Sequence, residues 1–441
     1  MPIFGIVWRF IKKPTSKHVV INTLGNYLNV FFTAFFVLLL VRIFTKSQYG
    51  VLSVLLGIAY VLANILDFGT TATIYSYLPP MIERKAPNIY RFIKTTFFYQ
   101  SVFSGIVIVM LLVTFPTLDK AFFKTGAPLS EMYLTSLMVL FLIWQNFALN
   151  ILFAAKKFIR ANLYLNVSNV IKTAAILLLA ATRQVSVGSI LFVYGILGPV
   201  IFFLLIFLEK KDLVFILLKS DVKREEFRFD YTFTYFVASQ FLNLGLRMDL
   251  FLLSYFRTKA EVGVYGLSQK IILTIITTII SITQVLSPNF SKIKTKEETF
   301  HQLKTGLLYL LVPGLLFFLV FITPNEVFYL FFTEKFAQTA AVTKALSLPF
   351  ILFSLNNLLN LFLLYTVRKP MPILVANIAF FLVLTVGCYY LIPLKGVFGP
   401  PYAIFLAFLI QTLILGVVSV REYKKIPDQS RLNQYSTVNS R

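Results

Sequence analysis

Twelve long apolar runs, separated by shorter polar segments, limit what this sequence can fold into. An α-helix needs about 20 mainly apolar residues to cross a bilayer, and each run reaches that length. The runs span residues 19–44, 50–78, 92–116, 131–155, 161–182, 187–208, 231–256, 262–289, 303–323, 338–366, 371–393 and 397–420. They predict an all-α polytopic membrane protein of about 12 transmembrane helices. The apolar stretch 327–332 is too short to span and is expected to be re-entrant or interfacial.

The distribution of basic residues predicts the orientation of these spans. With the N-terminus in the cytoplasm, 28 of the 41 Lys and Arg residues fall in cytoplasmic segments, 9 in outer loops and four inside spans. Cytoplasmic loops of membrane proteins carry such an excess. No small-residue cleavage site follows the basic residues of segment 1–18, so the first run is expected to remain as a signal anchor. Both termini are therefore predicted to be cytoplasmic.

The chain divides into two halves of six spans that resemble each other. Residues 1–208 are predicted as an N-terminal six-helix bundle, 209–230 as a cytoplasmic linker, 231–420 as a C-terminal bundle and 421–441 as a cytoplasmic tail. NYLN followed by TKSQYGV in the first half matches QFLN followed by TKAEVGV in the second. In a second match, Asn150 and Asn166 correspond to Asn360 and Asn377. An internal duplication with an even number of spans predicts bundles related by a pseudo-twofold axis along the membrane normal, with a cleft between them.

Several chemistries have no residues to support them. The single Cys388 rules out a disulfide framework, and the two histidines lie in polar stretches, so neither a metal site nor a bound cofactor is expected. The formal charge of +23 is explained by basic residues beside the membrane rather than by nucleic-acid binding. The sequence contains neither a phosphate-binding loop nor a metalloprotease motif, and no catalytic residue is predicted.

Three basic residues fall deep inside predicted spans, where an ionised side chain is costly and indicates function. They are Lys172, Arg247 and Lys270. The latter two each lie 11 residues from the tip of the seventh–eighth hairpin, roughly 16 Å below it. We expect a cationic cavity that binds an anion. The alternative is structural pairing, in which Asp249 would neutralise a neighbouring cation.

Polar residues recur at helical spacing on the first two spans of each half. They are predicted to line a hydrated lumen, although hydrogen bonds between helices use the same residue types. The predicted lumen residues are Asn26, Asn29, Asn64, Asn243, Thr274, Thr277, Ser281 and Gln284. Asp249 and Asp67 are the acidic residues deep enough for ion coupling or gating, with H⁺ or Na⁺ as the coupling ion.

Three short elements resemble a known family. They are RIFTKSQYG (42–50), DFGT (67–70) followed by Tyr75 and Leu78, and RMDLFLLSYF (247–256) followed by EVGVY (261–265). In order and spacing they resemble the Wzx-type lipid-linked oligosaccharide flippases. These form the polysaccharide-transporter branch of the multidrug/oligosaccharidyl-lipid/polysaccharide exporter (MOP) superfamily.

The resemblance implies a function and partners. Such a protein moves undecaprenyl-pyrophosphate-linked sugar repeat units, such as O-antigen units, from the inner to the outer leaflet of the bacterial cytoplasmic membrane by alternating access. Its partners would be the lipid-linked glycan, membrane lipids, and a polysaccharide polymerase and chain-length regulator. The three deep cations would then attract the pyrophosphate or acidic sugars.

Four other functions remain open at this stage. A multidrug cation antiporter of the same superfamily would share the architecture, but acidic lumen residues are expected there. A peptidoglycan-precursor flippase typically has two further helices. An unrelated 12-helix symporter would not account for the three elements. A membrane enzyme or assembly scaffold is disfavoured because the outer loops are short and no catalytic constellation is present.

Overall fold

The computed structural model describes residues 14–44, 46–123, 125–257, 259–331 and 337–428. Across these residues the chain is helical, and no strand is found in them. Each of the twelve predicted spans coincides with a helix or a run of consecutive helices, which confirms the all-α polytopic fold. Large apolar side chains point outward from these helices, with Val113 75% and Val417 71% exposed. Outward apolar surface of this kind is expected of helices that face lipid, and the chain is a multi-pass membrane protein.

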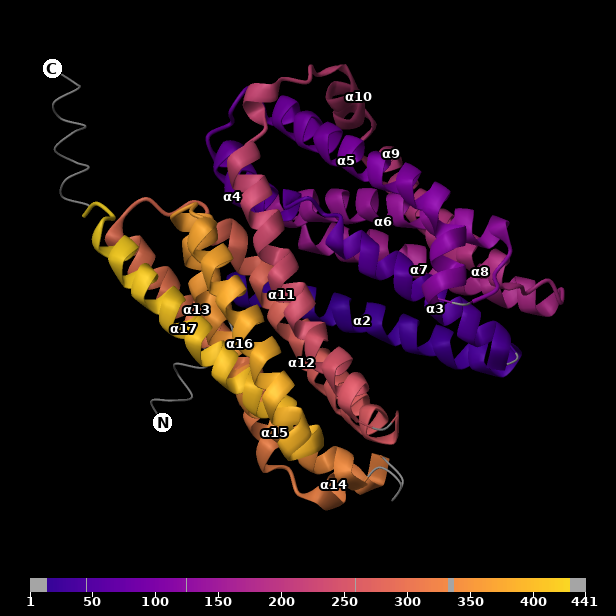
Figure 1. Ribbon diagram of the computed structural model, residues 1–441. Helices are drawn as coiled ribbons and strands as arrows, with labels where there is room; N and C mark the ends of the chain where they lie inside the picture. Colours follow the sequence, from indigo (N-terminus) through magenta and orange to yellow (C-terminus); the bar gives the residue numbers. More distant parts are fainter. Residues whose placement is uncertain (1–13, 45, 124, 258, 332–336, 429–441) are drawn as a thin grey trace, which may run out of the picture. The chain divides into compact units, whose positions relative to one another are not determined.

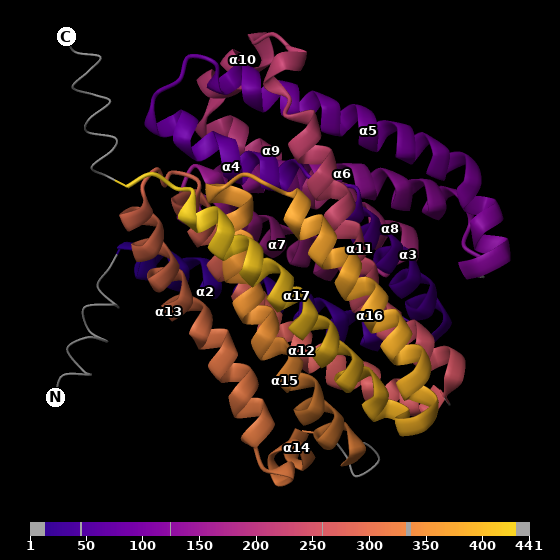
Figure 2. The same ribbon diagram turned by 60° about the vertical axis from the view of Figure 1, so that its left-hand side comes forward.

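The helices pack as two compact units, the first comprising residues 1–74 and 81–229 and the second residues 75–80 and 230–441. The first contains α2 (Pro14–Ile43), α3 (Lys46–Ile65), most of α4 (Thr70–Glu83), α5 (Ile89–Leu118), α6 (Leu129–Ala154), α7 (Phe158–Ala181), α8 (Val187–Phe192), α9 (Gly198–Glu209) and α10 (Lys211–Lys219). The second contains α11 (Phe229–Phe256), α12 (Lys259–Phe290), α13 (Lys296–Ile322), α14 (Asn325–Phe331), α15 (Ala337–Leu361), α16 (Met371–Lys395) and α17 (Gly399–Lys424). Figures 1 and 2 label these helices, and in both views α16 and α17 lie side by side.

The second predicted span is broken into α3 and α4, which meet at 47°. Phe68 and Gly69 at the break have φ values of +52° and +71°, a conformation that ends a right-handed helix. Asp67 then caps α4, because its carboxylate accepts hydrogen bonds from the backbone N–H and the hydroxyl of Thr71, at 3.2 and 2.9 Å. A carboxylate is also favourable at the positive end of a helix. The D-F-G-T element is thus the sequence of a helix break.

Other boundaries have similar local causes. Thr295 and Glu298 form a reciprocal capping box at the start of α13. Gly396, with φ of +58°, lies between α16 and α17. The predicted span 338–366 is α15 followed by one π-helical turn, Phe362–Thr366. The short stretch 327–332 falls in α14 as far as Phe331, and its last residue lies outside the described residues. The predicted linker 209–230 contains the amphipathic helix α10, none of whose residues is buried.

In the first unit, α2 and α7 run parallel and are joined by paired asparagines. Asn162 donates to Asn22 Oδ1 at 3.0 Å, and Asn169 donates to Asn29 Oδ1 at 2.8 Å. Between these pairs, Gly25 lies so close to α7 that a methyl group at its Cα would be 2.1 Å from Asn162 Oδ1. The close approach lets short amide side chains reach across the helix pair.

We therefore expect Gly25→Ala to destabilise the first unit. The added methyl group must push α2 away from α7, at a cost of about 1–3 kcal/mol for overpacking. Thermal unfolding of the purified protein in detergent should show a lower Tm. Gly57→Ala is the matched control, because a Cβ at Gly57 in α3 would meet nothing within 4 Å. Equal Tm values for both variants would contradict close packing at Gly25.

Candidate functional site

Lys172 is a buried cation in the middle of α7. Its side chain is 9% exposed, and its Nζ lies 4.6 Å from the centroid of the Tyr194 ring. That ring in turn packs on Phe36 of α2, with a centroid distance of 3.9 Å. Gly198 leaves room for the lysine stem, since a Cβ there would be 2.6 Å from Lys172 Cδ. The ammonium group therefore lies over one aromatic ring from a sequence-distant segment, and that ring is supported by a second ring from α2.

No carboxylate lies within ion-pair distance of Lys172 among the residues that the structure describes. A ring face attracts a cation, by about 0.5–2 kcal/mol, but does not neutralise it. A charge kept inside a membrane domain without a counter-ion is costly. The arrangement suits a site that receives a transient anion. The sequence left open the alternative that the deep cations form structural ion pairs. For Lys172, no acidic partner lies at ion-pair distance among the described residues.

The polar residues predicted to line a lumen divide into different environments. In the first unit, Asn26 and Asn29 are half-buried and Asn64 is exposed. Asn29 accepts a hydrogen bond from Asn169, which lies one turn before Lys172 in α7. In the second unit, Asn243 and Thr274 are exposed, Thr277 and Gln284 are half-buried, and Ser281 is buried. Ser281 donates to the Thr277 carbonyl oxygen at 2.8 Å within its own helix.

Arg247 lies in α11 and Lys270 in α12, but their side chains lie outside the described residues. Both helices belong to the second unit, whereas Lys172 belongs to the first. The proposed roles of Arg247 and Lys270 therefore stay predictions.

Asp249 is the centre of a buried polar cluster in the second unit. It is 2% exposed, and its carboxylate accepts hydrogen bonds from the Tyr265 hydroxyl and, at 3.2 Å, from Gln269 Nε2. Asp249 comes from α11, whereas Tyr265 and Gln269 lie four residues apart on one face of α12. A carboxylate that accepts from a hydroxyl and an amide in this way can exchange a proton or bind a small cation. Asp67, in contrast, has the helix-capping role described above and is half-buried.

A second buried network joins four helices of the second unit. Asn377 of α16 donates to the Ala238 carbonyl oxygen in α11 at 2.9 Å and accepts from Gln411 of α17 at 2.7 Å. Gln411 accepts from Asn356 of α15 at 2.9 Å. All three side chains are at most 2% exposed. Because every amide has partners inside the protein, this network fits a structural role rather than a lumen.

The two units repeat one interhelical hydrogen bond. In the first, Asn166 of α7 donates to the Gly25 carbonyl oxygen in α2 at 3.4 Å. In the second, Asn377 makes a similar bond to Ala238 of α11, one residue before the position that the QFLN match aligns with Gly25. Asn166 and Asn377 are the residues that the internal sequence match pairs. The shared geometry supports an internal duplication.

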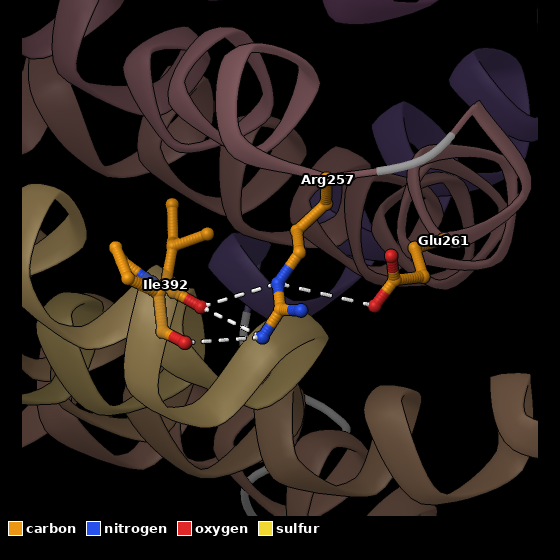
Figure 3. A network of polar contacts seen from close by, with 4 residues as sticks. Arg257, Glu261 and Ile392 are labelled. Carbon is orange, nitrogen blue, oxygen red and sulfur yellow. Dashed lines mark hydrogen bonds and ion pairs between the residues drawn. The ribbon is translucent and has the colours of Figure 1, made fainter.

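Arg257 directly follows α11 and joins the C-terminal end of that helix to the C-terminal end of α16 (Figure 3). Its guanidinium donates to the carbonyl oxygens of Ile392 and Pro393, at 3.2 and 3.3 Å, and lies 4.0 Å from Glu261. Carbonyl groups in the last turn of a helix are less fully hydrogen-bonded than those inside it. Ile392 also accepts from the Gly396 N–H, and the arginine adds further donors there.

Sequence reasoning missed the aromatic and amide partners of the key charges. Tyr194 and Gln269 carry no signal of their own, although Gln269 precedes the singled-out Lys270. Tyr265 is the last residue of the EVGVY element. That element indicated the family resemblance, but it did not indicate that Tyr265 would donate to Asp249.

Comparison with known proteins gives one family match. A family model described as polysaccharide biosynthesis protein matches residues 16–294. None of the curated proteins matches the chain.

Solved structures share the fold at low sequence identity. A MATE crystal structure has a TM-score of 0.75 and 13% identity, covering 95% of this chain and 98% of that chain. A MOP superfamily transporter from Pyrococcus furiosus has a TM-score of 0.72 and 12% identity, with the same coverage of 95% and 98%. A variant of the Vibrio cholerae MATE transporter VcmN has a TM-score of 0.72 and 11% identity, covering 93% of this chain and 95% of that chain.

Proposed function

The chain belongs to the polysaccharide biosynthesis protein family, and on that premise we propose that it is a flippase for lipid-linked oligosaccharides. Its substrate would be an undecaprenyl-pyrophosphate-linked repeat unit, moved from the inner to the outer leaflet of the bacterial cytoplasmic membrane. The likeness to MATE and MOP structures supports a transporter fold. Both termini would be cytoplasmic, as the basic residues predict.

The observation that carries this proposal is Lys172. Its ammonium group is buried beside Tyr194 at 4.6 Å, with no carboxylate at ion-pair distance in the described part of the chain. An anion in a low-dielectric site is attracted far more strongly than in water. The pyrophosphate would supply the negatively charged partner that Lys172 lacks among the described residues. We also propose Arg247 and Lys270, in the second unit, as anion-binding residues.

The transport cycle follows from the chemistry of the substrate. The pyrophosphate would be drawn to the cations, and the amide and hydroxyl side chains of the polar stripes would hydrogen-bond the sugar. The polyprenyl tail would stay in the bilayer, because leaving it would expose a long hydrocarbon chain to water. Alternating access would then carry the head group across. A polysaccharide polymerase and a chain-length regulator would act on the product.

Coupling to an ion gradient would use Asp249. The buried carboxylate accepts from Tyr265 and Gln269, and it would alternate between a protonated and an ionised state during transport. Na⁺ would be held by the carboxylate and neighbouring oxygens in the ionised state. Asp67 would act as a gate at the α3–α4 break rather than as the ion carrier, because its carboxylate already caps α4.

A multidrug cation antiporter is the second candidate. The buried Asp249 favours it, since an acidic group attracts organic cations, and the fold likeness to MATE transporters is compatible with it. The uncompensated Lys172 favours an anion instead. A peptidoglycan-precursor flippase has an anionic substrate as well, and the experiment below separates the two.

Complementation tests these functions against one another. The chain would be expressed in strains lacking either an oligosaccharide flippase or the peptidoglycan-precursor flippase, and in a strain sensitised to cationic drugs. We expect restored surface glycan in the first strain, with no rescue in the second and no drug resistance in the third. Drug resistance without surface glycan across several glycan backgrounds would overturn the proposal.

A further inference from the structure

The second unit contains a cavity of about 640 Å³ at the ends where α11 and α16 begin and α17 approaches its end. Its walls are mainly apolar and include Tyr231, Val375, Ile414 and Val418. The rim is charged, with Asp230, Arg368 and Lys369. An apolar volume with a charged rim suits an amphiphile, since one end of the ligand is hydrocarbon and the other is polar.

The cationic side chains at the rim are held in position. Arg368 has its guanidinium carbon 4.9 Å from the centroid of the Tyr77 ring and donates to the Ser291 carbonyl oxygen at 3.4 Å. Lys369 lies 2.8 Å from Glu422, and that carboxylate is shared with Lys425 at 2.7 Å. Among the residues that line the cavity, two cations, Arg368 and Lys369, face one carboxylate, Asp230, so the net charge of the lining is positive.

Two helix ends add to this positive potential. Asp230 is the second residue of α11, and Met371 is the first residue of α16, and both line the cavity. The start of a long helix carries a partial positive charge that favours anions. The positive charge of Arg368, Lys369 and these helix ends is larger than the negative charge of Asp230, the single acidic residue that lines the cavity.

The apolar side of the cavity faces the membrane. Met371 is 58% exposed and Val375 47% exposed, and Leu413 and Val417 beside the α17 wall are exposed as well. Such residues on a membrane helix contact acyl chains. The segment 366–370 at the rim joins two spans on the side predicted to be cytoplasmic, where anionic lipids and basic loops meet.

We propose that this cavity binds a lipid phosphate, with the phosphate at Arg368 and Lys369 and the hydrocarbon chain along Val375, Ile414 and Val418. The phosphate could come from an anionic glycerophospholipid of the membrane or from a polyprenyl phosphate, and both have the same recognised chemistry. The cavity lining does not include Lys172, and this proposal does not depend on the flippase proposal.

Native mass spectrometry of the full-length protein in detergent tests the site. The ligands are dioleoyl-phosphatidylglycerol, undecaprenyl phosphate, dioleoyl-phosphatidylcholine and inorganic phosphate, each added alone. We expect the first or second, or both, to bind at least roughly tenfold more tightly than phosphatidylcholine. Inorganic phosphate should not bind measurably, since it lacks the chain. Whichever of the two anionic lipids binds identifies the source of the phosphate.

Three variants locate the binding. Arg368→Gln combined with Lys369→Gln should weaken the preferred lipid by roughly tenfold or more. Ile414→Trp should also weaken it, because the ring fills the cavity without changing the charge. Lys425→Gln is the matched control, since Lys425 contacts the same Glu422 but does not line the cavity. Equal binding by the double variant and the control, or equal binding of phosphatidylcholine, would overturn the proposal.

Discussion

Replacing Lys172 with methionine should strongly reduce export of the lipid-linked glycan while leaving the protein as stable as before, or more stable. Methionine keeps the length of the stem against Gly198 and loses the charge. The loss of one charge-assisted contact to the substrate should reduce transport by roughly ten- to hundredfold. The fold should not suffer, because a buried charge without a counter-ion contributes little stability or opposes it. Surface glycan in a flippase-null strain and the Tm in detergent measure the two effects.

Lys395→Met is the matched control for this variant. Lys395 also lies over a tyrosine ring, 4.3 Å from the Tyr402 centroid, but is exposed. We expect normal export from the control. If Lys172→Met lowered Tm strongly and exported glycan in proportion to the folded protein that remained, Lys172 would be structural. Full export by Lys172→Met would remove the main support for an anionic substrate.

Asp249→Asn should disconnect transport from the ion gradient. Asparagine has nearly the same shape and retains one oxygen to accept from Tyr265 or Gln269, but it cannot ionise. In proteoliposomes, flipping by the natural protein should accelerate when a pH or Na⁺ gradient is imposed. Flipping by the variant should proceed at one slow rate with or without the gradient.

Tyr265→Phe separates ionisation from hydrogen bonding at the same site. It removes one donor to Asp249 and leaves the carboxylate, so a gradient response should persist at altered strength. An Asp249→Asn protein that still responds to both gradients would exclude Asp249 as the coupling group. Such a result would leave the anionic-substrate proposal unaffected, because Lys172 carries that proposal independently.

The twelve spans could be predicted because the bilayer imposes one length and one composition on every membrane helix. Local exceptions within a span were harder to foresee. The second span has a continuous apolar pattern, yet the helix breaks at residues 66–69, where Phe68 and Gly69 adopt positive φ. Hydropathy does not detect this break, since Phe68 is apolar and the residues on both sides are helical.

The polar stripes illustrate a second limit. The spacing of Asn26 and Asn29 predicts that they share one helical face, but the same spacing is found in residues that line a lumen and in residues that form a helix contact. In the structure, Asn29 pairs with Asn169 across α2 and α7. Likewise, a deep lysine could be identified from sequence, whereas its Tyr194 and Phe36 surroundings depend on which helices meet. Tertiary packing decides such partners, and short-range patterns do not encode it.

Flipping by the purified protein tests the central claim most directly. Proteoliposomes would carry a fluorescent undecaprenyl-pyrophosphate-linked oligosaccharide, and quenching by a membrane-impermeant reagent would report its leaflet. The natural protein should move the labelled lipid between leaflets, and Lys172→Met should move it roughly ten- to hundredfold more slowly. Neither protein should transport a cationic dye. Transport of the dye with no movement of the labelled lipid would contradict an anionic lipid-linked substrate and favour the antiporter.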